Sequence, residues 1–190
     1  MNKVKVLIEG YAKQVENGWV ASSTTILVQV GDKNIIVDPG CNRQRLIYGL
    51  TKEGLKPTDI DSVLLTHSHT DHTLLTGMFG NAKVLNDREV YDGDKQVDHN
   101  GKILGTDLKI IPTPGHSEDG VSLIIPTDEG TYAIVGDVFW WKDDEKQVLG
   151  INKPDPYVDD MTEILKSRKK VLDLADFIIP GHGKIMKVKK

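Results

Sequence analysis

Apolar residues gather in many short runs between polar and glycine-marked stretches, a pattern typical of buried strands. Strands are predicted where β-branched and aliphatic residues gather between turn residues, at residues 4–8, 24–30, 34–38, 61–66, 131–135 and 177–179. The segment Gly31-Asp32-Lys33 predicts a hairpin between the second and third of these strands. Residues 83–125 are also β-rich and are broken by glycines. Residues 11–23 are polar and contain glycine, which predicts a loop.

Two longer stretches follow the helical period instead. Asn42 is a suitable N-cap for a helix that reaches about residue 54, with Leu46 and Leu50 on its apolar face. A second helix is predicted from a cap at Asp159 or Asp160 to about residue 173, because its apolar residues recur at helical spacing.

A short helix is also predicted over residues 73–79. Strand-rich halves that each carry helices predict an α/β fold in which two sheets pack together with helices outside. The chain shows no internal repeat, low-complexity segment or linker. We therefore expect one domain over residues 1–190.

The stretch Thr66-His67-Ser68-His69-Thr70-Asp71-His72 carries three imidazoles and one carboxylate directly after a predicted buried strand. An ordinary core does not use this composition, because each buried polar group needs a partner. Imidazole nitrogen and carboxylate oxygen are the ligands that Zn²⁺ and similar cations prefer. The stretch therefore predicts a metal site where a rigid strand ends.

Three further candidate ligands follow the same rule. His116, Asp137 and His182 each come after an apolar strand-like run and lie at a turn marked by glycine. Strand ends that present ligands to one edge of a fold indicate a single shared site. His99 lies in a polar stretch and is expected at a solvent-facing turn.

Composition and charge narrow the functional classes. The net charge is 24 − 28 = −4, so no overall basic field favours nucleic acid. The basic run at residues 166–170 and the C-terminal lysines are expected to be solvated. Cys41 is the only cysteine and is expected to be a small buried hydrophobe. With no signal-like or membrane-length apolar run, we expect a cytoplasmic protein without membrane contact.

The ordered set of histidines and aspartates resembles the metallo-β-lactamase superfamily from residue 26 to residue 182. Asp38, in Ile36-Val37-Asp38-Pro39-Gly40, corresponds to the first motif of that family. The resemblance implies a four-layer αββα sandwich with two packed mixed sheets and helices outside. The likeness is strongest to the small single-domain members of the metallo-β-lactamase domain-containing protein 1 type.

The resemblance also implies seven metal ligands: His67, His69 and His116 for one metal, Asp71, His72 and His182 for the other, and Asp137 as the bridge. Asp38 is implied to orient a ligand imidazole. The expected cofactors are two Zn²⁺, with Fe or Mn as alternatives.

Two divalent ions about 3.5–4 Å apart share a water and lower its pKa to about 7. We therefore expect a dinuclear hydrolase whose bridging hydroxide attacks an ester, lactone, thioester or phosphodiester-type substrate. Asp71 is expected to orient the hydroxide and shuttle its proton, or to serve as a ligand only. The alternatives are an RNA or DNA phosphodiesterase, a mononuclear-iron sulfur dioxygenase and, least favoured, a non-catalytic metal-stabilised binding module.

Aromatic residues near the expected site are candidates for the substrate pocket. Phe139, Trp140 and Trp141 follow Asp137 closely, and they are predicted to line the pocket or to pack in the core. Trp19, next to a glycine in the predicted loop, is a candidate lid residue. The expected partner is a small-molecule substrate. Nucleic acid is not favoured, and a homodimer is left open.

Overall fold

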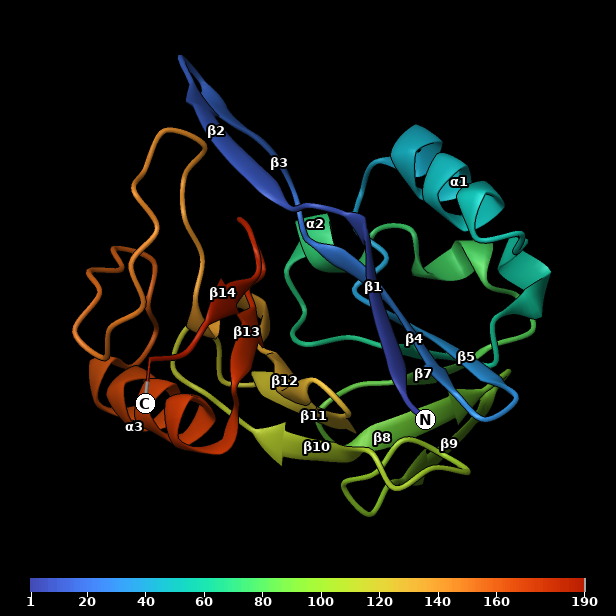
Figure 1. Ribbon diagram of the computed structural model, residues 1–190. Coiled ribbons are helices and arrows are strands. Elements are labelled where there is room, and N and C mark those ends of the chain that lie inside the picture. The colour runs from blue at the N-terminus through green and yellow to red at the C-terminus, as the bar shows by residue number, and fades with distance from the viewer. Residues whose placement is uncertain (190) are drawn as a thin grey trace.

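Two β-sheets lie face to face in the computed structural model, which describes residues 1–189 (Figure 1). The first sheet has the strand order β1-β4-β5-β6-β7-β8-β9. Its strands are β1 (Lys3–Ile8), β4 (Thr25–Val30), β5 (Lys33–Val37), β6 (Ser62–Leu64), β7 (Lys83–Leu85), β8 (Glu89–Asp92) and β9 (Lys95–Asp98). The second sheet consists, in order, of β10 (Lys109–Pro112), β11 (Val121–Thr127), β12 (Gly130–Ile134), β13 (Phe177–Ile179) and β14 (Met186–Lys187).

The stretch predicted as a loop over residues 11–23 is a two-stranded hairpin instead. β2 (Tyr11–Val15) and β3 (Gly18–Ser22) pair antiparallel and project beyond the two main sheets (Figure 1). Beyond its base, only one face of this hairpin, with Ala12, Trp19 and Ala21, is buried or half-buried; that face also carries the polar Gln14, while the exposed Val15 and Val20 lie on the other face. The alternation that identifies a half-buried strand is therefore absent from its sequence.

Both long helices form as predicted. α1 (Arg43–Lys52) begins after Asn42, whose side chain accepts a hydrogen bond from the amide of Arg45. α3 (Met161–Leu174) begins after Asp160, which caps two amides of its first turn.

The prediction of one short helix over residues 73–79 is wrong. A four-residue helix α2 (Thr70–Thr73) is followed by the 3₁₀ turn η2 (Thr76–Met78). Between them, the amide of Leu75 donates to the carbonyl of Gly40, and this contact with a distant segment interrupts the helix. The other 3₁₀ turns are η1 (Pro57–Asp59) and η3 (Gly136–Val138).

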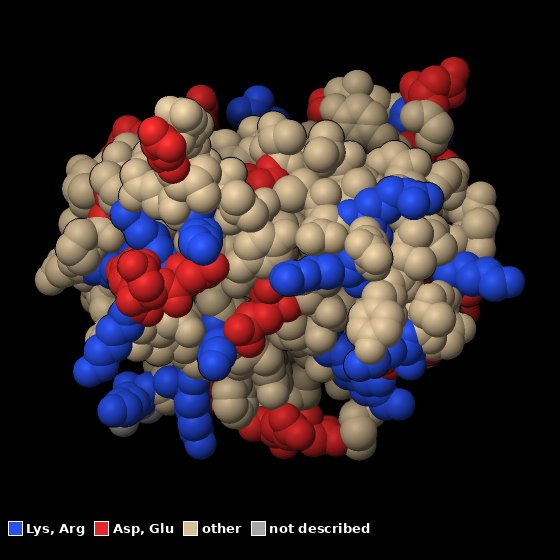
Figure 2. Space-filling view, turned by 90° about the horizontal axis from the view of Figure 1, so that it is seen from above, with Lys and Arg blue, Asp and Glu red and all other residues tan. Residues whose placement is uncertain are grey.

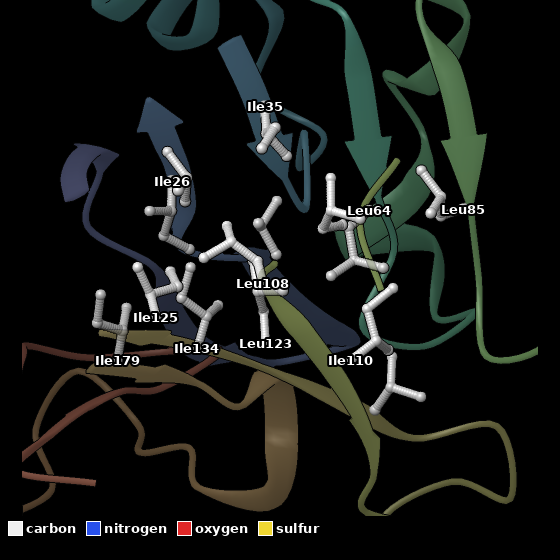
Figure 3. Packing of buried hydrophobic residues seen from close by; sticks show 14 of the residues in the cluster. Ile26, Ile35, Leu64, Leu85, Leu108, Ile110, Leu123, Ile125, Ile134 and Ile179 are labelled. Carbon is white, nitrogen blue, oxygen red and sulfur yellow. The ribbon is translucent and has the colours of Figure 1, made fainter. Parts of the chain in front are cut away.

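The hydrophobic core is divided by the sheets into layers, because successive residues of a strand point to opposite faces. In β4, Ile26 and Val28 point into the space between the two sheets, where Figure 3 shows the packed side chains. Leu27 lies between them in sequence and points outward, where it shares a cluster with Leu46 and Leu50 of α1.

The second sheet repeats this arrangement on the other side. Ile134 and Ile179 belong to the central layer, whereas Ala133 and Ile178 pack outward in a cluster with Ile164 of α3. Figure 1 shows α1 and α3 on opposite sides of the sheet pair. The four-layer αββα fold expected from the sequence is confirmed.

Parallel pairing within each sheet determines where the candidate ligands lie. β5 pairs parallel with β6, and β12 pairs parallel with β13. The carboxyl ends of parallel strands lie at the same edge of a sheet, so Asp38 and Thr66 emerge together, as do Asp137 and His182. Separately, no helix within residues 1–189 has the length and apolarity needed to cross a membrane.

Candidate metal centre

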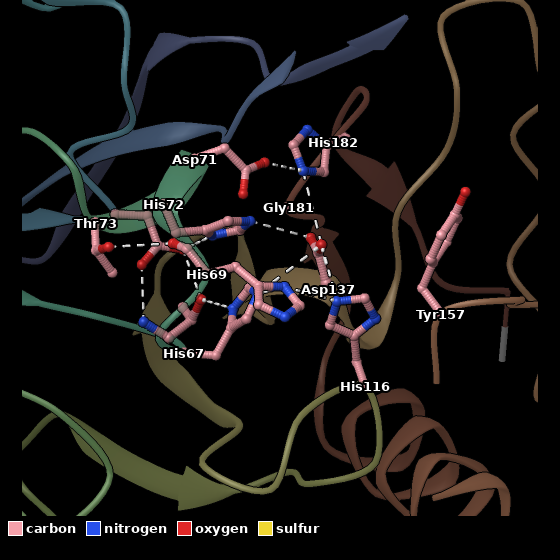
Figure 4. Close-up of polar contacts among 12 residues, drawn as sticks. His67, His69, Asp71, His72, Thr73, His116, Asp137, Tyr157, Gly181 and His182 are labelled. Atoms are coloured by element: carbon pink, nitrogen blue, oxygen red, sulfur yellow. Dashed lines mark hydrogen bonds and ion pairs between the residues drawn. The ribbon is translucent and has the colours of Figure 1, made fainter. Parts of the chain in front are cut away.

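The seven predicted ligands converge at one edge of the sandwich (Figure 4). In each of two groups, the potential ligand atoms all lie within 4.8 Å of one another. The first group consists of His67, His69, His116 and Asp137, and the second group of Asp71, His72 and His182. Residues separated by more than a hundred positions thus meet in one cluster.

Three ring nitrogens approach one another in the first group. Nδ1 of His69 lies 3.0 Å from Nε2 of His67 and 3.2 Å from Nε2 of His116. Oδ2 of Asp137 lies 3.4 Å from Nε2 of His116 and 4.0 Å from Nε2 of His67. Two nitrogens at about 2.0–2.1 Å from a tetrahedral zinc are separated by about 3.3 Å. The spacing of this group therefore suits a tetrahedral cation.

Asp137 connects the two groups. Its Oδ1 lies 3.4 Å from Nε2 of His72, while its Oδ2, which faces the first group, lies 3.7 Å from Nε2 of His182. Nε2 of His182 also lies 3.2 Å from Oδ2 of Asp71. One carboxylate with an oxygen toward each group has the arrangement that a bridging ligand requires.

The cluster contains buried acceptor atoms that a cation would satisfy. Nδ1 of His72 lies 2.7 Å from Oδ2 of Asp38, so a proton on Nδ1 leaves Nε2 as a lone pair. This Nε2 and Oδ1 of Asp137 are both buried, and neither has a hydrogen-bond partner among the described residues. Two such buried atoms are costly to leave side by side unless a metal ion, or a proton on Nε2, lies between them. The residues present thus fit divalent metal ions.

Two glycines allow the chain to approach the cluster closely. A Cβ at Gly181 would lie 1.8 Å from Oδ1 of Asp137. Gly136 has φ +51°, and a Cβ there would lie 2.4 Å from Oγ1 of Thr66. Any larger residue at either position would displace the side chains around Asp137.

Asp38 supports the cluster from behind. Its Oδ1 accepts from the amide of Thr66 at 2.8 Å, and its Oδ2 accepts from Oγ1 of Thr66 at 2.6 Å. Because Oδ2 also contacts Nδ1 of His72, this one buried carboxylate orients both a ligand ring and the strand end that carries His67.

Electrostatics in the cluster follow from burial and from the carboxylates. Burial opposes the charge of His72, but Asp137 and Asp38 outweigh burial and raise the pKa of His72 well above its usual value. Burial likewise opposes the charge of Asp137, yet the histidines around it hold its pKa well below the usual range. Burial and neighbouring imidazoles lower the pKa of His67, which keeps this ring neutral, as a metal ligand must be.

Two residues that the sequence reasoning missed lie directly behind His116. Oδ2 of Asp155 is 3.5 Å from Nδ1 of His116 and 3.5 Å from Nη2 of Arg168. Burial opposes the charge of Asp155, but hydrogen bonds from His116 and from the amide of Tyr157 lower its pKa.

Arg168 corrects the expectation that residues 166–170 are all solvated, since it is completely buried. The spacing of the sequence indicates this burial, because Arg168 follows Ile164 by four residues and precedes Val171 by three, which puts it on the buried face of α3.

A cavity of about 490 Å³ opens beside the cluster and is lined by Trp19, Trp140 and Tyr157 together with His69 and Asp71. The Trp19 ring centroid lies 6.2 Å from that of Trp140 and 6.0 Å from that of Tyr157. Tyr157 had no motif to identify it.

Phe139 and Trp141 do not line this cavity, which corrects their assignment to the substrate pocket. Both are buried in the hydrophobic cluster under α3, where their rings stack with centroids 5.9 Å apart. Side chains alternate in an extended segment, so Trp140 faces the cavity while its two neighbours face α3.

Comparisons with known proteins identify a family and several structures of similar fold. The profile of the family described as "Metallo-beta-lactamase superfamily" matches residues 18–95. "Metallo-beta-lactamase domain-containing protein 1" of Xenopus laevis is 31% identical over 100% of this chain and 83% of its own length. A putative metallo-beta-lactamase from Thermotoga maritima has a TM-score of 0.71 at 20% identity, covering 98% of this chain and 99% of that one. The dizinc quorum-quenching lactonase AidC has a TM-score of 0.64 at 19% identity, covering 87% of this chain and 74% of that one.

Proposed function

The chain belongs to the metallo-β-lactamase superfamily, and from this premise we propose that it is a dinuclear, zinc-dependent hydrolase of an uncharged ester, lactone or thioester. The observation that carries the proposal is the pair of ligand groups joined by Asp137, with buried acceptor atoms that lack hydrogen-bond partners among the described residues. A bound pair of divalent cations supplies a water of lowered pKa and polarises the scissile carbonyl.

The protein's own side chains account for the remaining requirements. His67, His69 and His116 would hold one cation, Asp71, His72 and His182 would hold the other, and Asp137 would bridge. Asp71 is half-buried, lines the cavity and contacts His182 through Oδ2 at 3.2 Å. This position supports a second role for its carboxylate, in which it would accept the proton that the attacking water loses and return it to the leaving group.

The lining of the cavity supports an apolar, uncharged substrate. Trp19, Ala21, Leu74 and Trp140 form much of its wall, and no Lys or Arg is found among its described lining residues. On the face seen in Figure 2, basic and acidic side chains are interspersed between uncharged areas, without a continuous basic track among the described residues. A polynucleotide substrate requires cations along its phosphates, so an RNA or DNA phosphodiesterase is less favoured.

Metal content and a matched substrate panel test the proposal. We expect about two zinc ions per chain, with hydrolysis of acyl esters, lactones or thioesters exceeding hydrolysis of a phosphodiester. His182→Gln should lose metal and activity, whereas His99→Gln should keep both, because His99 bonds to Asn86 and Gly101 instead of the cluster. A single iron with oxygen consumption would favour the dioxygenase. Metal-loaded protein that hydrolyses no member of the panel would favour the binding module, and protein that binds no metal even after reconstitution would refute all of these functions.

A further inference from the structure

We propose that Asp155 is a positioning residue that holds the His116 ring in its ligating orientation, and that Arg168 fixes Asp155 for this task. Neither residue belongs to the two ligand groups. The inference rests on the proposed metal site and adds a determinant of its affinity. An ion pair between α3 and the segment before it would set how well the first group binds its metal.

The two nitrogens of His116 face different partners. Nε2 points into the cluster, 3.2 Å from Nδ1 of His69 and 3.4 Å from Oδ2 of Asp137. Nδ1 points away from it, 3.5 Å from Oδ2 of Asp155. An acceptor at Nδ1 favours the tautomer that carries its proton there, which leaves the Nε2 lone pair for a metal. Asp155 therefore selects both the direction and the tautomer of this ring.

Asp155 is held as firmly as the ring that it faces. Its side chain has 0% exposure, and a buried carboxylate without a counter-charge is strongly disfavoured. Nη2 of Arg168, also with 0% exposure, supplies that charge at 3.5 Å. Oδ1 of Asp155 accepts from the amide of Tyr157 at 3.0 Å, which fixes the rotation of the carboxylate.

Arg168 is itself fixed by the backbone around it. Its Nε donates to the carbonyl of Val138 at 3.0 Å, and its Nη1 donates to the carbonyls of Ile151 and Lys153. These contacts tie α3 to the end of η3 and to the segment that carries Asp155. An arginine with so many fixed donors cannot move toward solvent, so its charge defines where Asp155 lies.

The second ligand group has a separate support of the same kind. There, Asp38 contacts Nδ1 of His72 at 2.7 Å, as Asp155 contacts Nδ1 of His116. Each group thus has one histidine backed by its own buried carboxylate. Because Asp155 contacts a histidine of the first group only, its loss should weaken one metal and leave the other largely unaffected.

The first experiment compares Asp155→Asn with Asp144→Asn, which makes the same charge change at an exposed position of the same segment. Zinc affinity is measured by competition with a chromophoric chelator, and imidazole NMR signals of His116 and His72 report which group is filled. We expect one zinc of Asp155→Asn to bind about 10–100-fold more weakly, as is usual when a ligand loses its hydrogen-bonded carboxylate. Arg168→Met should weaken the same zinc, and Asp144→Asn should match the parent.

A second measurement needs no variant and so does not depend on whether Asp155→Asn folds. Long-range ¹H–¹⁵N spectra of the parent protein should show the Nδ1-protonated tautomer of His116, with and without zinc. An Nε2-protonated His116, or unchanged zinc affinity in a folded Asp155→Asn, would overturn the inference while leaving the proposed function intact. A parent protein that binds no zinc would instead refute the proposed function, and the tautomer would still decide the role of Asp155.

Discussion

Replacement of Gly181 by alanine should break the bridge between the two ligand groups. The new Cβ would lie 1.8 Å from Oδ1 of Asp137, whereas real Cβ contacts are almost never shorter than 3.0 Å. The carboxylate or the backbone must therefore move by at least 1.2 Å, the difference between these distances. Metal–ligand distances tolerate about 0.2 Å, so a shift of this size exceeds what a bridging carboxylate can accommodate.

The backbone at Gly181 has little freedom to absorb this shift. Its amide donates to the carbonyls of Gly136 and Phe139 at 2.7 and 3.1 Å, and its carbonyl accepts from the amide of Thr24 at 2.6 Å. We therefore expect Asp137 to move and the protein to lose about 1–3 kcal/mol through overpacking. For a chain of this size, that loss corresponds to a Tm about 2–12 °C lower.

Zinc content and thermal unfolding of Gly181→Ala measure the two effects separately. Gly80→Ala is the matched control, since nothing lies within 4 Å of a Cβ at that position. The control should keep both zinc ions and change Tm by no more than about 2 °C. If Gly181→Ala also held two zinc ions with the affinity of the parent, the argument from close approach to Asp137 would be refuted.

Three further predictions concern pH, the cavity wall and the core. The affinity of the second ligand group for zinc should fall by up to about tenfold per pH unit as the pH is lowered. Asp137 and Asp38 raise the pKa of His72 despite its burial, so a proton competes with zinc for Nε2. Chelator competition between pH 6 and 9 checks this, and an affinity that does not change with pH contradicts it. Trp19→Ala should raise KM severalfold with zinc content unchanged, because Trp19 lines the cavity but contacts no ligand group. Steady-state kinetics and metal analysis of the same sample test this, and a loss of zinc would contradict a role of Trp19 in the substrate pocket alone. Leu27→Ala should lower the free energy of unfolding, measured in urea, by about 2–5 kcal/mol, because Leu27 is completely buried under α1. A decrease below about 1 kcal/mol would contradict the packing described.

The main strands, the two long helices and the candidate ligands could be predicted because their signals are local. Short apolar, β-branched runs in residues 24–38 and 61–66 identify strands, and Asn42 and Asp160 mark helix starts through bonds to amides two or three residues later. Histidines directly after a buried strand identify a metal site through composition alone. No information about distant parts of the chain is needed for these inferences.

The remaining features depend on which segments meet in space. Asp155 has a role only because α3 delivers Arg168 to one side of it and His116 lies on the other. Phe139 faces the core and Trp140 faces the cavity, because the extended segment that carries them runs between α3 and the cluster of candidate metal ligands.

The sequence by itself therefore determined the layered fold and the set of candidate ligands. Both depend on short-range patterns, namely the spacing of apolar residues along each element and the residue types at the strand ends. Only the tertiary structure decided the Asp155–Arg168 pair, the cavity wall and the form of the β2–β3 hairpin. These features arise from contacts between residues far apart in the chain, and such contacts leave no period or spacing in the sequence.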